Sequence, residues 1–303
     1  MTARSDTARE GDAPIVVGVD GSQAAAAAAH WAAALAGKFD APLELVTGLS
    51  TRGTALADAA AALLSPVSER QRHWATSVLQ RHEKDLRTRF PGLDLISLRC
   101  DVPAGEALAT RSNTARMVVL GTDQVSPAAA ILVGSTTLTV AARSACPVVA
   151  WRGKLDTPTA APIVVGVDDP AVGMAAFDAA FEVAARLGVE LRAVHAWPKF
   201  RLPGLVNPYL TDADAFETLQ WQGLLTALDP WTARYPGVKV RYYLEPESAN
   251  TCLLRHAEDA QLVVVGGRRR GVLASALLGS TSLSLLHHCP VPVMVCHRQP
   301  STG

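Results

Sequence analysis

The stretch IVVGVD occurs twice in the 303-residue chain, at residues 15–20 and again at 163–168. Each copy is a short run of mostly β-branched residues that ends in an aspartate, which is typical of a buried parallel strand followed by a loop. A second repeated segment follows later in each half: MVVLGTDQVSPAAAILVGSTTLTVAARSACPVVAW begins at Met117, and LVVVGGRRRGVLASALLGSTSLSLLHHCPVPVMVC begins at Leu262. The chain therefore contains one folding unit in two copies.

The boundary between the copies is predicted in RGKLDTPTAAP, residues 152–162, because glycine, proline and threonine are typical of a linker. We expect a disordered tail at 1–13, a first domain at 14–152, a linker at 153–161 and a second domain at 162–298. A length of 303 residues also favours two domains, since single domains usually hold about 100–150 residues.

Runs rich in valine, isoleucine and leucine alternate with longer helical stretches in each half, which indicates β-α-β units around a parallel sheet. The predicted strands are 15–19, 43–47, 93–100, 116–121 and 148–151 in the first half, and 163–167, 190–195, 238–244, 262–266 and 291–296 in the second. Five strands per half predict an α/β fold made of two tandem, open, doubly wound parallel sheets. The expected strand order is flavodoxin-like, 3-2-1-4-5, with helices on both faces.

Ligands of such sheets bind at the carboxyl ends of the strands, where the winding direction reverses. With the order 3-2-1-4-5, the first and fourth strands flank this point. Asp20 and Asp168 follow the first strands, whereas Gly121 and Gly266 end the fourth strands. The sequence therefore predicts one candidate binding site in each domain.

A glycine followed by hydroxyl residues opens the last predicted helix of each half, as Gly134-Ser135-Thr136 and Gly279-Ser280-Thr281. The start of a helix exposes unpaired N–H groups and the positive end of the helix dipole, which together attract a phosphate. The glycine would let the backbone approach such a phosphate closely. The alternative is that the serine is simply a helix cap and the glycine a turn residue.

The spacing of these residues resembles that of the universal stress protein family, of the nucleotide-binding type. The shared features are a strand-ending glycine, a pattern close to G-x2-G-x9-G-[ST], an aspartate after a VVGVD strand, and a final CPV strand. The resemblance spans both halves, so it implies a tandem universal stress protein with the adenine nucleotide alpha-hydrolase-like fold. At the second glycine of the motif this chain has Gln124 in the first domain and Arg269 in the second.

The resemblance implies that the ligand is ATP or a related adenine nucleotide, with or without Mg²⁺, and that the protein regulates a stress or dormancy response. In the second domain the implied nucleotide-binding residues are Asp168, Ala196, Gly266, Arg269, Gly279, Ser280 and Thr281. In the first domain they are Asp20, Gly48, Gly121, Gly134, Ser135 and Thr136. The aspartate would meet the nucleoside, Gly48 or Ala196 would line the adenine pocket, and the Gly-Ser segment would hold the phosphates.

The second site is expected to hold phosphates more tightly than the first. Its loop carries Arg268, Arg269 and Arg270, whereas the loop of the first domain carries Asp123 and no cation. A carboxylate about 8 Å from a phosphate charge costs roughly 2 kcal/mol at an effective dielectric constant near 20, which is roughly thirtyfold in affinity. Two features oppose this ranking: the arginines can equally form a solvated loop, and Asp169 adds negative charge near the second site.

Charge and motifs argue against several other classes of protein. Basic and acidic residues number 28 each, so no net charge draws the chain to nucleic acid or to an anionic membrane. The five cysteines are scattered, which argues against disulfides and a zinc site and favours the cytoplasm. No P-loop, GxSxG or HExxH motif occurs. We therefore predict no membrane segment, no catalytic residue, no metal site and at most weak ATP hydrolysis.

Two alternatives to a nucleotide-binding regulator stay open: a slow ATP-hydrolysing enzyme, and a structural pseudo-dimer whose nucleotide sites are degenerate. The fifth strands, CPVVAW and CPVPVMVC, are expected at sheet edges, where the family resemblance implies that they pair the two domains; a homodimer is a further expectation. The proline-rich segment 198–212 is expected to act as a lid, with 50–65 as its counterpart. His195 and His287-His288 are expected to be structural.

Overall fold

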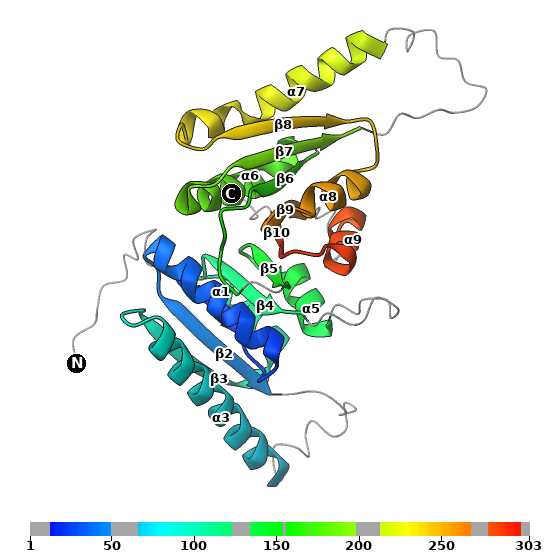
Figure 1. Ribbon diagram of the computed structural model, residues 1–303. Coiled ribbons are helices and arrows are strands. Elements are labelled where there is room, and N and C mark those ends of the chain that lie inside the picture. The colour runs from blue at the N-terminus through cyan, green and yellow to red at the C-terminus, as the bar shows by residue number, and fades with distance from the viewer. Residues whose placement is uncertain are drawn as a thin grey trace, which may run out of the picture. The chain divides into compact units, whose positions relative to one another are not determined.

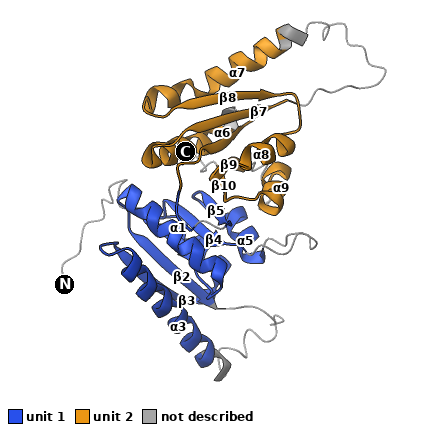
Figure 2. Ribbon diagram, in the orientation of Figure 1, with its two compact units in different colours: residues 1–158 blue, residues 159–303 orange. Residues whose placement is uncertain are grey.

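The computed structural model describes residues 13–49, 66–122, 134–153, 156–168, 170–197, 213–267 and 278–297. It divides into two compact units, Met1–Pro158 and Thr159–Gly303, which Figure 2 shows in separate colours. Several features predicted from the sequence lie outside the described residues: the tail up to residue 12, the segments 50–65 and 198–212, and Asp123, Gln124, Asp169 and 268–270.

The first unit is built around a five-stranded parallel sheet (Figure 1). Its elements are β1 (Ile15–Gly18), α1 (Gln23–Phe39), β2 (Leu43–Leu49), α3 (Pro66–Arg89), β3 (Leu95–Pro103), α4 (Ala104–Arg111), β4 (Met117–Gly121), α5 (Ser135–Arg143) and β5 (Val148–Trp151). The strands pair in the order β3-β2-β1-β4-β5. Helix α1 packs beside α3 and α4 packs beside α5, so both faces of the sheet are covered.

The second unit repeats this arrangement. Its elements are β6 (Ile163–Val167), α6 (Pro170–Leu187), β7 (Leu191–Ala196), α7 (Ala213–Arg234), β8 (Val240–Glu245), α8 (Ala249–Ala257), β9 (Leu262–Gly267), α9 (Ser280–His288) and β10 (Val293–His297). The strands pair in parallel in the order β8-β7-β6-β9-β10. The predicted order 3-2-1-4-5 is therefore confirmed in each unit, whereas pairing between the fifth strands stays a prediction.

The central strands are buried over most of their length because helices cover both faces. In β1, Ile15, Val16 and Val17 have no exposed surface, and the corresponding residues of β6 are equally buried. A strand buried on both sides needs no alternation of apolar and polar residues, which explains why continuous apolar runs located these strands in the sequence.

The strand limits differ most from the prediction at the third strand of the first unit, which was predicted at 93–100 and lies at Leu95–Pro103. The last strand of the second unit also starts later than predicted. The prediction was 291–296, whereas β10 begins at Val293. Pro292 has no N–H and cannot donate to the ladder, but its carbonyl accepts a hydrogen bond from the N–H of Val263 at 3.0 Å. The proline therefore sits just before the strand, and regular pairing starts after it.

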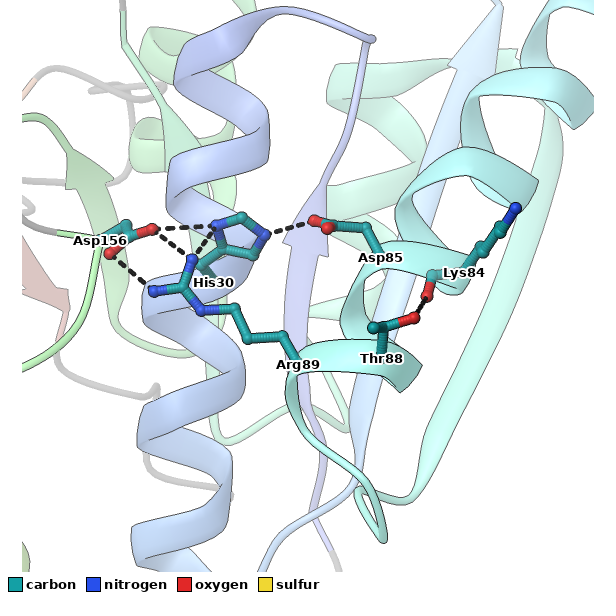
Figure 3. A network of polar contacts seen from close by, with 6 residues as sticks. All are labelled: His30, Lys84, Asp85, Thr88, Arg89 and Asp156. Atoms are coloured by element: carbon teal, nitrogen blue, oxygen red, sulfur yellow. Dashed lines mark hydrogen bonds and ion pairs between the residues drawn. The ribbon is translucent and has the colours of Figure 1, made fainter.

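The predicted linker is held by side chains of the first unit at its start. Arg89 donates two hydrogen bonds to the carboxylate of Asp156, at 2.7 and 3.1 Å, and Nδ1 of His30 lies 3.1 Å from the same carboxylate (Figure 3). The other ring nitrogen of His30 contacts Asp85 of α3. Burial alone would raise the pKa of Asp156, but the hydrogen bonds from Arg89 and His30 outweigh it and lower that pKa.

The linker is held by the second unit at its other end. Gln261, a buried side chain, accepts a hydrogen bond from the N–H of Thr159 at 2.8 Å, and its amide donates to the carbonyls of Thr159 and Ala161. Only residues 157 and 158 separate the two sets of contacts. The segment predicted as a linker is therefore bound over most of its described length.

Substituting Asp156 with asparagine should speed cleavage of this segment by trypsin severalfold, with Lys154 as the nearest site. The substitution removes the charge that pairs with Arg89 and His30, so the segment leaves its bound conformation more often. Gel electrophoresis of timed digests gives the rate. Asp101→Asn is the matched control, because Asp101 forms exposed ion pairs with Arg72 and Arg99 elsewhere. Equal cleavage rates in wild type and Asp156→Asn would contradict the expectation.

Candidate functional site

The last helix of each unit begins without a side-chain cap. Gly279 is the N-cap of α9, with φ −59° and ψ 152°, and Gly134 is the N-cap of α5, with φ −56° and ψ 144°; neither helix has a side-chain capping hydrogen bond among the described residues. In contrast, α1 is capped by Ser22 and α8 by Ser248, whose hydroxyl oxygens accept helix N–H groups at 3.1 and 3.3 Å. The alternative in which the serine after the glycine caps the helix is therefore wrong.

The two N-cap glycines have no structural reason to be glycine within the described part of the chain. Their φ angles are negative and open to any residue. A Cβ atom on Gly134 would meet nothing within 4 Å, and one on Gly279 would meet only the hydroxyl oxygen of Ser282, at 3.9 Å. Among the described residues, both helix starts thus have no side-chain cap and border open space, which is an arrangement that can accept a bound anion.

The glycines at the ends of the fourth strands differ, because packing requires them. A Cβ atom on Gly121 would lie 2.4 Å from the backbone of Ala24 in the first turn of α1. In the second unit, β9 extends one residue beyond the predicted Gly266, and a Cβ atom on Gly267 would lie 2.3 Å from the ring of His297. The hydroxyl of Ser282 donates to the carbonyl of Gly266 at 3.3 Å, so the first turn of α9 is tied to the end of β9.

The two aspartates lie at the same edge of their sheets as these helix starts. Asp168 directly follows β6, which pairs in parallel with β9. Asp20 lies two residues beyond β1, is exposed, and accepts a hydrogen bond from the N–H of Ser22 at 3.0 Å. Because parallel strands end at one edge, each unit brings a carboxylate and an uncapped helix start to the carboxyl edge of the same sheet.

Gly48 is placed differently from the prediction. It was expected after the second strand, but it lies inside β2, beside a register shift between Thr47 and Leu49. A Cβ atom on Gly48 would lie 2.5 Å from the Cα and N atoms of Ala104, so the residue is needed for close packing against the start of α4. Its counterpart Ala196 is the last residue of β7. Sequence alone could not reveal this contact, because Ala104 belongs to a distant segment.

His195 holds the turn that carries Asp168. Its Nδ1 lies 2.8 Å from the carbonyl oxygen of Val167, the residue before Asp168, and its Nε2 lies 2.9 Å from the side-chain oxygen of Gln220 on α7. Both ring nitrogens are thus engaged within the protein, as the structural role predicted from the sequence implies. Gln220 was missed in the sequence because nothing in the helix pattern distinguishes it from other polar surface residues.

Four further observations concern the chemistry and surface of the described residues outside this sheet edge. Burial raises the pKa of Cys146 to about 11, so its thiol is not an accessible nucleophile near neutral pH. No group of three potential metal ligands comes together in the described ranges, and no helix there is long and apolar enough to cross a membrane. A surface depression on α3, lined by Gln80, Glu83, Lys84, Arg87 and Thr88, borders none of the predicted site residues.

Comparison with known proteins identifies the class that this duplicated fold defines. The model of the universal stress protein family matches the chain twice, at residues 13–152 and 160–297. The chain therefore belongs to the universal stress protein family, and it carries two such domains in tandem.

Curated relatives match this chain over nearly their whole length. The chain is 34% identical over 297 residues to universal stress protein Rv2005c of Mycobacterium tuberculosis (strain H37Rv), covering 94% of this chain and 97% of the relative. It is 30% identical over 298 residues to universal stress protein Rv2623 of the same strain, covering 93% and 95%. A solved universal stress protein from Archaeoglobus fulgidus has a TM-score of 0.62 at 20% identity, covering 94% of this chain and 98% of that one, which shows the common fold.

Proposed function

We propose that the chain binds an adenine nucleotide, ATP or a close relative, and acts in a stress or dormancy response as a regulatory module rather than as an enzyme. The observation that carries this proposal is the pair of glycine-led helix starts that lack a side-chain cap and face open space among the described residues. A terminal phosphate would accept hydrogen bonds from the backbone N–H groups at these helix starts and would be stabilised by the helix dipole. Mg²⁺, when present, would accompany the phosphates.

The carboxylates at the same sheet edge would bind the other end of the nucleotide. Asp20 and Asp168 repel phosphate, so they suit the sugar hydroxyls or the donor groups of a base. The arginine-rich sequence after β9 still favours phosphate binding in the second domain, whereas the first-domain loop carries Asp123 instead. We therefore expect the second domain to retain nucleotide more strongly than the first.

Nucleotide released from the heat-denatured, purified protein tests this proposal. We expect nearly one nucleotide per wild-type chain, and a loss of most of it in Gly279→Val, because the valine side chain would occupy the open space at the start of α9. Gly134→Val is the matched control: it makes the same change at the equivalent backbone geometry in the first domain and should leave retention nearly unchanged. Two nucleotides per chain would contradict the ranking of the domains, and none from any preparation would contradict binding.

Slow ATP hydrolysis is the competing function, and the described residues give it little support. The imidazole of His195 is engaged on both nitrogens, and the thiol of Cys146 stays protonated. Hydrolysis would be favoured if the protein releases phosphate from ATP and if Asp168→Ala abolishes this release while nucleotide is still bound.

A further inference from the structure

Helix α3 borders the turn that follows Asp20. Gly21 adopts a positive φ of 80°, and a Cβ atom on it would lie 3.3 Å from Cγ2 of Val78 and 3.9 Å from Cζ2 of Trp74. Val78 is fully buried under this turn, whereas Trp74 keeps 44% of its surface exposed. One edge of the indole therefore packs against the turn, and much of the ring stays open to solvent at the carboxyl edge of the sheet.

The second unit exposes an apolar side chain at the equivalent position. The ends of helices α3 and α7 lead into the related sequences RFPG and RYPG, which begin at Arg89 and Arg234. Trp74 and Leu219 each lie fifteen residues before that arginine, so they occupy equivalent positions. Leu219 is 60% exposed. An exposed leucine is ordinary on a protein surface. The two domains differ in that only the first has an aromatic ring at this position, and that ring lies beside the turn after Asp20.

The charges at the edge of the sheet determine which part of a nucleotide would reach Trp74. The carboxylate of Asp20 repels phosphates, which would bind instead at the uncapped start of α5. The sugar and base would then lie toward Asp20 and Gly21, where Trp74 packs. A base presents a flat π face, and an indole ring is the side chain that stacks best on such a face.

We propose that Trp74 stacks on the base of the nucleotide bound by the first domain, so that this domain depends on base contact where the second depends on phosphate contact. This inference rests on the proposed nucleotide binding. Stacking on an aromatic side chain contributes roughly 5- to 100-fold in affinity per base. It needs no cation, which suits a site whose phosphate loop has none in its sequence. Trp74 is then a specificity-determining residue of the first domain.

The test compares ligands with and without a base, using the full chain with Gly279→Val to suppress the second site. Equilibrium dialysis would measure the affinity of the Gly279→Val protein for adenosine, ATP and tripolyphosphate. The same measurements would be made after adding Trp74→Leu or Trp74→Phe. Leucine copies the residue that the second domain has at this position. We expect Trp74→Leu to weaken the binding of adenosine and ATP at least about tenfold and Trp74→Phe to weaken it much less. The binding of tripolyphosphate should be unaffected. Because 44% of the Trp74 surface is exposed, thermal unfolding should change much less than the binding of ATP.

Each other outcome overturns the inference in a recognisable way. ATP bound equally by the first domain with and without Trp74 rejects stacking while leaving nucleotide binding intact. If Trp74→Leu weakens the binding of tripolyphosphate as much as the binding of ATP, then Trp74 supports the structure of the site and does not contact the base. If only the second domain binds nucleotide, Trp74 has no base to stack on, and the inference is also rejected. Absence of nucleotide from both domains of the wild-type chain rejects the proposed function itself.

Discussion

Replacing Arg111 with methionine should destabilise the first domain by about 3–5 kcal/mol, the cost of leaving a buried charge without its partner. Glu44 lies in β2 with only 1% of its surface exposed, and Arg111 at the end of α4 donates hydrogen bonds to both of its carboxylate oxygens. The hydrogen bond to Glu44 raises the pKa of Arg111 despite partial burial of the guanidinium. Urea unfolding followed by circular dichroism would measure the loss.

A double substitution separates loss of the partner from loss of the pair. In Glu44→Leu with Arg111→Met, no charge stays buried, and stability should recover most of the way because apolar residues of similar size can replace a buried ion pair. A single Arg111→Met variant that unfolds at nearly the wild-type urea concentration would show that Glu44 is not held by Arg111 alone.

The second domain reverses the polarity of this pair. Arg192 occupies the position in β7 that Glu44 has in β2: each lies opposite the second residue of the neighbouring central strand. Its partner Asp259 has a side chain that is 66% exposed. A second carboxylate, that of Glu190, has its Oε1 3.7 Å from Nε of Arg192. Asp259→Asn should therefore cost about 1 kcal/mol or less, since the pair is partly solvated and Arg192 keeps a second carboxylate. The reversed charges also disfavour exchange of these strands between the two similar domains.

The fold was predictable from local patterns because its central strands are buried on both faces. Ile15 and Ile163 open continuous apolar runs, and the repeat itself confirmed that both halves needed one architecture. Contacts between distant segments were not predictable in this way. The packing of Gly48 on Ala104 and the binding of Asp156 by Arg89 each join residues whose proximity depends on the finished fold.

The candidate site shows the same division. Its glycine-led helix starts were visible in the sequence, but the choice between a serine cap and a glycine cap depends on backbone angles that composition does not fix. Trp74 gave no signal, because a single aromatic residue in a polar helix resembles any surface residue. Its position next to Gly21 follows only from the packing of α3 against that turn.

Glycines of two kinds lie in the first domain, and one substitution made at both should separate them. Gly121→Ala should destabilise the domain by about 3 kcal/mol, the upper part of the range for overpacking, because the new Cβ would lie 2.4 Å from backbone atoms of Ala24 that cannot rotate away. Gly134→Ala should cost about 1 kcal/mol or less, because alanine is a poorer N-cap residue than glycine, but its φ of −56° suits alanine and the space is open. Thermal and urea unfolding of both variants would measure the contrast. Similar losses at the two positions would mean that Gly134 serves packing as Gly121 does, and the open space at the start of α5 would then give no reason to place a ligand there.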